Sequence, residues 1–209
     1  MKLPDWGGRT CAIIAGGPSA NVADADRVRA ADLPTIVINN SYQLAPWADI
    51  LYFCDDRWWG WHENEPALKA FCARDDAAIV TLDNLKLVEA NPYIISFKNT
   101  GRLGLERESG GLRNGSNSGY QAINLAIHLG AKRILLLGYD MGVVGGKDHW
   151  HAGHPVSTPA SLYTQLLIPA YATLAPELKR EGIVVQNCCM TSALTVFPLV
   201  PLNEALQND

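Results

Sequence analysis

The chain has 209 residues, of which 48% are hydrophobic and 18% are charged, and its formal net charge is −4 at pH 7. This composition supports a sizeable hydrophobic core and argues against intrinsic disorder. An acidic chain without a long Lys/Arg block lacks the basic face that sequence-independent binding to DNA requires, so we do not expect a nucleic acid as its partner.

Two further features of the composition bear on where the protein works. No apolar run approaches the roughly 18 residues needed to cross a bilayer, and the first ten residues, MKLPDWGGRT, lack the apolar core of a signal peptide. We therefore expect a cytoplasmic protein without a membrane span. The cysteines match no zinc-binding spacing, and we expect them to be buried thiols. They are Cys11, Cys54, Cys72, Cys188 and Cys189.

The first half of the chain alternates short apolar runs with segments of helical periodicity. The strands are continuous apolar runs, such as TCAIIA, and this pattern is typical of strands buried on both faces. In chain order we predict a strand at 10–15, a helix at 21–32, strands at 35–39 and 49–55, a helix at 57–75 and a strand at 77–83.

The second half continues the alternation around two long loops. We predict a strand at 93–98, a glycine-rich loop at 99–116, a helix at 117–130, a strand at 133–140, a loop at 142–157, a helix at 159–182 kinked near Pro169, a strand at 183–187 and a short helix in the tail. Strands separated by helices require right-handed crossovers and give a mostly parallel sheet. We therefore predict one α/β domain over residues 1–209, a Rossmann-like doubly wound sheet with helices on both faces.

The stretch AIIAGGPSAN ends the first predicted strand in Gly16, Gly17, Pro18 and Ser19. Ligands of doubly wound sheets bind beyond the carboxyl ends of the strands, near the point where the strand order reverses. Glycines let the backbone approach a ligand, the following helix N-terminus favours a phosphate, and Ser19 can bind the ligand or cap the helix. An ordinary strand-to-helix turn remains open, because the motif is neither a dinucleotide fingerprint nor a P-loop.

Two other polar groups follow strands or open helices at the same predicted edge. Asn39 and Asn40 end the second strand, where their amides can bind a base or a ribose, or form an Asx turn. Asn117, Ser118 and Gly119 open a helix directly after the glycine-rich loop. Capping explains one of these residues, and a second helix N-terminus facing the same crevice would favour a nucleotide.

The segment GYDMGVVGGKDHWHAGHP carries a cluster of histidines next to Asp148. His149, His151 and His154 fall within six residues of an irregular loop. One of them is a candidate general base, because histidine titrates near neutral pH. A metal site and an exposed loop with incidental histidines are the alternatives.

Acidic residues and arginines supply the remaining candidates. Asp55 and Asp56 follow the third strand, where carboxylates bind a metal or a hydroxyl group, or cap the next helix. The arginines of the 99–116 loop either close over an anionic ligand or lie on the surface. They are Arg102, Arg107 and Arg113.

The order of these motifs resembles one superfamily over most of the chain. The segments AGGPSAN, INNSY, NSGYQAINLAIHLGAKRILLLGYDM, the histidine-bearing loop and VQNCCMTSALTVFP are similar to bacterial sialyltransferases of glycosyltransferase family 42 and to MptE-like 6-hydroxymethylpterin diphosphokinases. The chain also resembles small prophage-encoded members of that group. This resemblance implies a Rossmann-like fold and a nucleotide or nucleotide-sugar donor.

The resemblance assigns roles to residues of this chain. The nucleotide-binding positions it implies are Gly16, Gly17, Pro18, Ser19, Asn39, Asn40, Asn117, Ser118, Gly119, Gly138 and Tyr139. The catalytic positions it implies are Asp140 and one base among His149, His151 and His154. In the diphosphokinase branch ATP and Mg²⁺ would bind, and Asp55, Asp56 or Asp140 would hold the metal.

These observations lead to one predicted function and two alternatives. We predict a nucleotide-dependent transferase, above all a glycosyltransferase that needs no metal cofactor and uses a loop histidine to deprotonate an unidentified acceptor. The first alternative is an ATP- and Mg²⁺-dependent diphosphokinase, and the second is a non-catalytic nucleotide-binding phage accessory protein. A homo-oligomer is compatible with the sequence.

Overall fold

Eight apolar segments form one parallel sheet in the computed structural model, which describes residues 3–152 and 158–208. The strand order is β6-β5-β4-β3-β2-β1-β7-β8, and each strand runs parallel to its neighbours. The strands are β1 (Thr10–Ile14), β2 (Thr35–Ile38), β3 (Ile50–Tyr52), β4 (Ala78–Leu82), β5 (Ile94–Asn99), β6 (Gly111–Leu112), β7 (Arg133–Leu137) and β8 (Val184–Asn187).

The central strand β1 shows why the apolar runs are continuous. Ile13 pairs with Ile36 of β2 on one side and with Leu136 of β7 on the other. Successive side chains of a strand point to opposite faces, so Ile13 enters one hydrophobic core and Ile14 enters the other. Both faces are covered, and neither tolerates polar residues at these positions.

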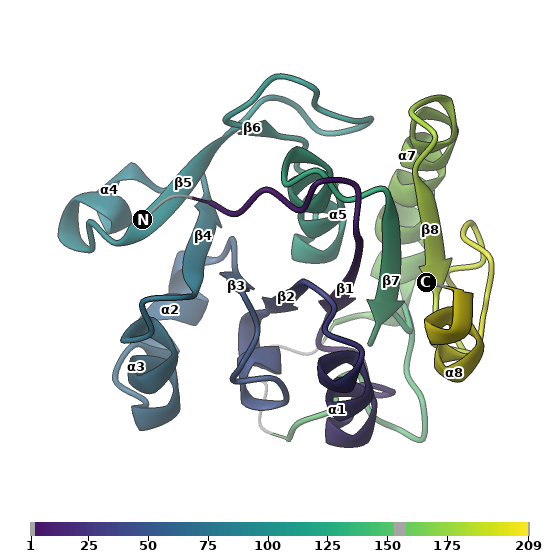
Figure 1. Cartoon of the computed structure of the whole chain (residues 1–209), viewed down its shortest axis with the longest axis horizontal. Helices are drawn as coiled ribbons and strands as arrows, with labels where there is room; N and C mark the ends of the chain where they lie inside the picture. The colour runs from purple at the N-terminus through teal and green to yellow at the C-terminus, as the bar shows by residue number, and fades with distance from the viewer. Residues whose placement is uncertain (1–2, 153–157, 209) are drawn as a thin grey trace.

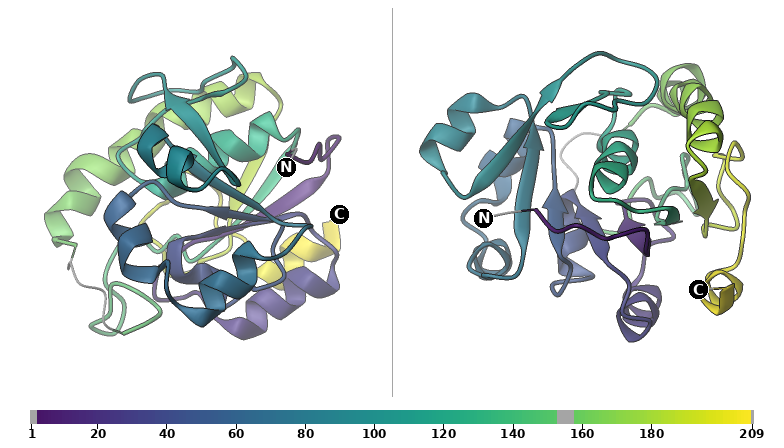
Figure 2. Two further views of the ribbon diagram at one scale, coloured as in Figure 1. Left: turned by 90° about the vertical axis from the view of Figure 1, so that its left-hand side faces the viewer. Right: turned by 45° about the horizontal axis from the view of Figure 1, so that its top comes forward.

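Helices cover both faces of the sheet, as predicted. In Figure 1, α5 and α7 lie above the central strands and α1 and α3 lie below them, and the turned views of Figure 2 show the same two layers. Within the described ranges, no helix is long and apolar enough to cross a bilayer. The main helices are α1 (Val22–Ala30), α2 (Asp56–His62), α3 (Pro66–Cys72), α4 (Leu85–Ala90), α5 (Ser118–His128), α7 (Ile168–Arg180) and α8 (Leu202–Ala205).

The strand order reverses next to β1. The chain builds the sheet outward from β1 to β6 and then returns through α5 to place β7 on the other side of β1. The switch point therefore lies between β1 and β7, where the loops that follow these strands diverge to opposite faces and leave room for a ligand.

Several elements differ from the sequence prediction. The predicted helix at 57–75 is two helices, because the chain turns after His62 and Pro66 starts α3 in the first turn, where its missing N–H costs nothing. Two short elements, α4 and β6, were not predicted. The predicted helix at 159–182 is irregular: α6 (Ala160–Leu162) leads into a π-helical turn, η2 (Tyr163–Leu167), directly before α7. The π-helical turn accommodates Pro169, whose ring would clash with the preceding turn of a regular α-helix.

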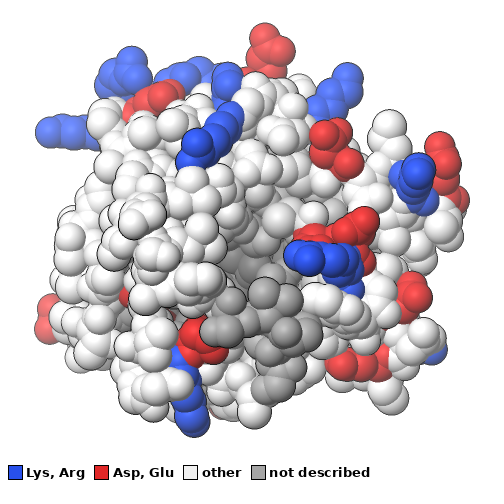
Figure 3. Space-filling view, turned by 180° about the vertical axis from the view of Figure 1, so that it is seen from behind, with Lys and Arg blue, Asp and Glu red and all other residues white. Residues whose placement is uncertain are grey.

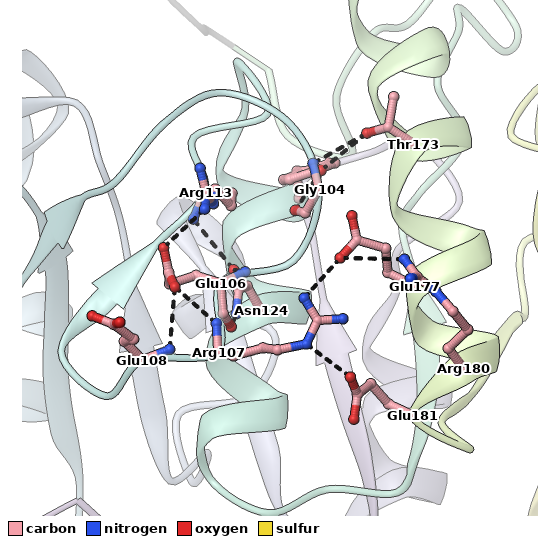
Figure 4. Close-up of polar contacts among 11 residues, drawn as sticks. Gly104, Glu106, Arg107, Glu108, Arg113, Asn124, Thr173, Glu177, Arg180 and Glu181 are labelled. Carbon is pink, nitrogen blue, oxygen red and sulfur yellow. Dashed lines mark hydrogen bonds and ion pairs between the residues drawn. The ribbon is translucent and has the colours of Figure 1, made fainter.

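The glycine-rich loop between β5 and α5 is tied to α7 by charged side chains (Figure 4). Arg107 lies 3.0 Å from a carboxylate oxygen of Glu177 and 2.8 Å from one of Glu181. Arg113 lies 3.3 Å from Glu106, whose other oxygen accepts the backbone N–H of Arg107 at 2.9 Å. The loop therefore holds a fixed path into the N-terminus of α5.

Candidate functional site

A cleft of about 370 Å³ opens at the carboxyl ends of the strands, around the switch point. Such a volume is within the range of small-molecule sites. The face turned away from the viewer in Figure 1 is hollowed near its centre, and most of the surface around the hollow is uncharged (Figure 3). The cleft is lined by Ala15 to Pro18, Ile38 to Asn40, Cys54, Asp55, Trp58, Ser116 to Gly119, Gly138, Tyr139, Met141, Gly142, Asp148, His149, His151, Thr158, Leu162, Tyr163 and Leu167.

The two glycines that follow β1 have different surroundings. A Cβ on Gly17 would lie 2.2 Å from Oδ2 of Asp140 and 2.3 Å from the Gly138 carbonyl, to which the Gly17 N–H also donates. A Cβ on Gly16 would meet only the ring of His149, at 3.5 Å. Gly17 thus lets the ends of β1 and β7 pack closely, whereas Gly16 faces the cleft.

Ser19 lies behind the cleft and does not line it. Its hydroxyl and its backbone N–H both donate to Oδ2 of Asp140, at 2.8 and 3.2 Å, and Asp140 is only 2% exposed. Ser19 does not cap α1, because the side chain of Asn21 accepts the N–H of Asp24 instead. Ser19 and Asp140 therefore fix the glycine turn to the end of β7, and neither lines the cleft that the other candidates form.

Asn39 and Asn40 reach the cleft from the end of β2. Asn39 adopts a left-handed conformation, with a φ of 50°, and its buried Oδ1 has no hydrogen-bond partner within the described residues. Asn40 accepts a hydrogen bond from the indole N–H of Trp58. A buried amide oxygen without a partner is costly, and a ligand donor at Asn39 would remove that cost.

The N-terminus of α5 opens directly into the cleft. Oδ1 of Asn117 caps the helix by accepting the Tyr120 N–H at 2.9 Å, and it also accepts the Tyr171 hydroxyl at 2.7 Å. The N–H groups of Ser118 and Gly119 have no hydrogen-bond partner within the described residues. They give the cleft two backbone donors and the positive end of an 11-residue helix.

Two helix N-termini were expected at the cleft, and within the described residues that of α5 faces it while that of α1 does not. We expected the helix after Gly16–Ser19 to present its N-terminus to a phosphate. The first residues of α1 do not line the cleft, and Asn21 at its N-cap borders a separate small cavity of about 70 Å³. The N–H groups of Ser19 and Gly17 donate to Asp140 and to the Gly138 carbonyl, so they do not donate to a ligand. The glycine turn therefore shapes the cleft, and the helix dipole at the cleft comes from α5.

Two of the three loop histidines line the cleft, and His154 lies outside the described residues. Nδ1 of His149 is 3.3 Å from the carbonyl of Gly16, and the N–H of Trp150 donates to the same carbonyl at 3.2 Å. The ring of His151 stacks on that of His149, with centroids 5.5 Å apart and planes 19° apart. The loop is therefore attached to the glycine turn, and the role of one of its histidines as a general base stays a prediction.

Three further lining residues, Leu162, Tyr163 and Leu167, come from α6 and the π-helical turn. Burial raises the pKa of the Tyr163 hydroxyl, a hydrogen bond with Thr158 opposes this rise, and the nearby charge of Asp148 adds to it. None of these three residues was among the predicted site residues. Proline near the centre of a predicted helix is the one feature that points to an irregular turn, and irregular turns are frequent at functional sites.

Asp55 lines the cleft, while Asp56 is exposed and does not. Asp55 caps α2 and pairs with Arg57 at 2.7 Å, and the hydrogen bonds from Arg57 lower the pKa of its carboxyl despite partial burial. In the part of the chain that the structure describes, no three His, Cys, Asp or Glu residues are grouped as ligands for a metal ion. Metal binding by Asp55 and Asp56 stays a prediction.

Arginine is absent from the cleft, and so is lysine, among the residues that the structure describes. Arg107 and Arg113, for which closure over an anion and a surface position were both left open, pair with acidic groups of α7 and of their own loop, and Arg102 does not line the cleft either. The positive groups of the cleft are therefore the N-terminus of α5 and, when protonated, the histidines.

Comparisons with known proteins find similarity at the level of structure. No family model matches the chain, and no curated protein matches its sequence. The sialyltransferase CstII from Campylobacter jejuni, solved with the substrate analogue CMP-3FNeuAc, has a similar structure, with a TM-score of 0.51 and 14% identity over 93% of this chain and 86% of that one. The sialyltransferase CST-II, solved with a trisaccharide acceptor and CMP, gives a TM-score of 0.52 and 16% identity over 92% and 86%. At these identities the similarity establishes a shared fold.

Proposed function

We propose that the protein is a glycosyltransferase that uses a nucleotide-sugar donor. The observation that carries the proposal is the cleft itself, in which the glycine turn, the amides after β2, the N-terminus of α5 and two histidines converge at the switch point. Two structures of a sialyltransferase with the same fold, named CstII, were solved with CMP-3FNeuAc or with CMP and an acceptor, which supports the same class of donor here.

The charge of the cleft favours a donor with one phosphate over a nucleoside di- or triphosphate. Asp55 and Asp148 are its acidic groups, and no Lys or Arg within the described residues lines it. A diphosphate would add a second negative charge to the cleft, where Arg57 is already paired with Asp55 and no lysine or arginine of the described residues is among the lining side chains. A single phosphodiester can be held by the backbone N–H groups of Ser118 and Gly119 and the dipole of α5.

The proposed chemistry is a direct displacement at the sugar carbon that carries the phosphate. A histidine removes the proton of the acceptor hydroxyl, the oxygen attacks the carbon, and the bond to the phosphate oxygen breaks with its electron pair leaving on the nucleotide. Charge that develops on the phosphate faces the α5 N-terminus, which is already oriented by Asn117 and Tyr171.

Thermal unfolding with candidate ligands tests the proposal. We expect CMP without metal to raise the melting temperature, by up to the equivalent of about 2.7 kcal/mol at 100 times its dissociation constant. UDP and GDP are tested in the same way, and a shift with either of them would point to a different nucleotide-sugar donor. A shift only with ATP and Mg²⁺ would instead support the diphosphokinase, and no shift with any of these ligands would contradict a nucleotide-dependent enzyme.

A further inference from the structure

A second cavity, of about 560 Å³, lies at the edge of the sheet, between α7 and the segment that follows β8. In Figure 1 this edge is on the right, where β8 is the last strand of the sheet. The floor of this edge groove is apolar and buried, with Leu178, Ile183, Val185 and Phe197 between 2% and 6% exposed. The edge groove shares no lining residue with the cleft, so the two cavities are separate.

The wall that α7 contributes to the edge groove carries small side chains and one lysine. These residues recur at three- and four-residue spacing, which places them on one side of the helix. Glu177 and Glu181 lie on another side of α7, where they pair with Arg107 at 3.0 and 2.8 Å (Figure 4). The small side chains leave the groove open, and no carboxylate of the described residues lines it. The residues of this wall are Ala172, Ala175, Pro176 and Lys179.

Lys179 gives the edge groove a positive charge that no described residue neutralises. The neighbouring Arg180 lies 4.0 Å from a carboxylate oxygen of Glu177, whereas the side chain of Lys179 forms no ion pair within the described part of the chain. A lysine can lay its methylene groups on an apolar surface and keep its ammonium group in water. An apolar floor with one unpaired cation at its rim therefore complements an apolar chain that ends in an anion.

The strand edge beside the groove offers little to an added β-strand, whether from a peptide or from a second copy of this chain. The backbone N–H groups of Val184 and Cys188 donate toward β7, so those of Val185 and Asn187 point away from the sheet. Asn187 already pairs with the 198–200 segment. Only Val185 of β8 is left to pair, and a strand that joins an edge needs several such residues. The groove therefore favours a small apolar chain.

We propose that the edge groove binds a long-chain fatty acid, with the hydrocarbon chain along the apolar floor and the carboxylate at Lys179. A carboxylate carries one negative charge, which matches the single ammonium group, whereas a phosphate monoester carries nearly two. The volume of the groove is within the range of sites for small molecules. Each methylene group that leaves water should tighten binding about fourfold until the chain fills the groove. This site does not depend on the function proposed for the cleft.

Calorimetric titration of the full chain with octanoate, decanoate and dodecanoate tests the apolar part of the site. We expect the affinity to rise about fourfold per methylene group along this series. Ala172→Trp places a large ring in the groove from an exposed position of α7, so we expect it to weaken decanoate binding at least 10-fold. An affinity independent of chain length, or a wild-type protein that binds none of the three acids, would overturn the proposal. So would a wild-type dimer in sedimentation velocity that Ala172→Trp dissociates, because the groove would then be an interface between copies.

Decanoate and decanol separate the charge of the ligand from its chain. Lys179→Met removes the ammonium group and keeps an apolar side chain, so we expect decanoate to bind about fivefold more weakly and decanol to bind within about twofold of the wild type. Lys86→Met is the matched control, because Lys86 lies in α4 toward the other edge of the sheet, and it should leave the binding of both ligands unchanged. If Lys179→Met binds decanoate as tightly as the wild type does, the carboxylate does not lie at Lys179 and the proposal is wrong.

Discussion

At the scale of single residues, the two adjacent glycines after β1 have different roles, because Gly17 packs against β7 and Gly16 faces the cleft. Alanine substitutions at the two positions should therefore have different effects. Gly17→Ala would place a methyl group against Asp140 and the Gly138 carbonyl, so we expect a loss of about 1–3 kcal/mol in the free energy of unfolding. Gly16→Ala meets only the His149 ring at 3.5 Å and should change stability by less than about 1 kcal/mol.

Urea unfolding of both variants measures this difference, and CMP binding measured alongside it gives the functional counterpart. We expect Gly16→Ala to weaken CMP binding because its methyl group enters the cleft. A Gly17→Ala variant as stable as the wild type would show that the ends of β1 and β7 separate easily. That result would contradict the close packing that fixes the glycine turn.

The sequence identified many of the residues that line the cleft but not the direction in which each one points. Gly16, Asn39, Asn117 and Ser118 lie where the carboxyl ends of parallel strands predict. Ser19 turns away because the buried carboxylate of Asp140, 121 positions later, takes both of its donors. A contact over such a separation depends on which strands become neighbours, and the local sequence carries no signal for it.

At the scale of elements, the loop from β5 to α5 is stabilised by a carboxylate that titrates far below its ordinary range. Hydrogen bonds from Thr100 and from the backbone N–H of Glu108, together with the charge of Arg113, lower the pKa of Glu106 from 4.5 to about 2. A lowered pKa in the folded state means that the ionised form stabilises the fold above about pH 4.5, and that this contribution is lost as the pH falls toward 2.

Glu106→Gln tests this contribution through its dependence on pH. We expect the variant to be less stable than the wild type by about 1–3 kcal/mol at pH 7, and the difference to shrink between pH 4.5 and pH 2. Thermal unfolding across this range measures it. Glu108→Gln is the matched control, because that exposed side chain lies outside the network and only its backbone N–H takes part. A constant difference across the pH range would contradict the role of the charge.

Elements with strong local signals were predictable, and elements set by tertiary contacts were not. Strands β1 and β7 read TCAII and RILLL, apolar after their first residue, and both were predicted. The two-residue strand β6 contains a glycine and exists only because β5 offers it an edge to pair with. The π-helical turn η2 depends on Pro169 beyond its end and on the cleft that its side chains line, so its sequence alone does not specify it.

At the scale of the whole molecule, the cleft exists only when distant parts of the chain are folded together. Its lining residues extend from Ala15 to Leu167 and come from both sides of the switch point. The sheet beneath them is the same sheet whose two faces carry the hydrophobic cores. A ligand in the cleft therefore stabilises the whole fold, because most of these contacts are absent from the unfolded chain.

The rate of cysteine labelling measures how far a ligand in the cleft stabilises the whole fold. All five cysteines are free thiols, and Cys11 is fully buried in the central strand β1, where desolvation raises the pKa of its thiol strongly. Alkylation of Cys11 then requires global opening, so its rate follows the unfolded fraction. We expect CMP at about 100 times its dissociation constant to slow labelling of Cys11 about 100-fold, as measured by mass spectrometry of the labelled peptides.

Cys72, half-buried at the end of α3, is the internal control and should be labelled faster and respond less to CMP. If CMP binds but leaves the labelling of Cys11 unchanged, β1 opens independently of the cleft. That result would contradict the claim that a ligand in the cleft stabilises the whole fold.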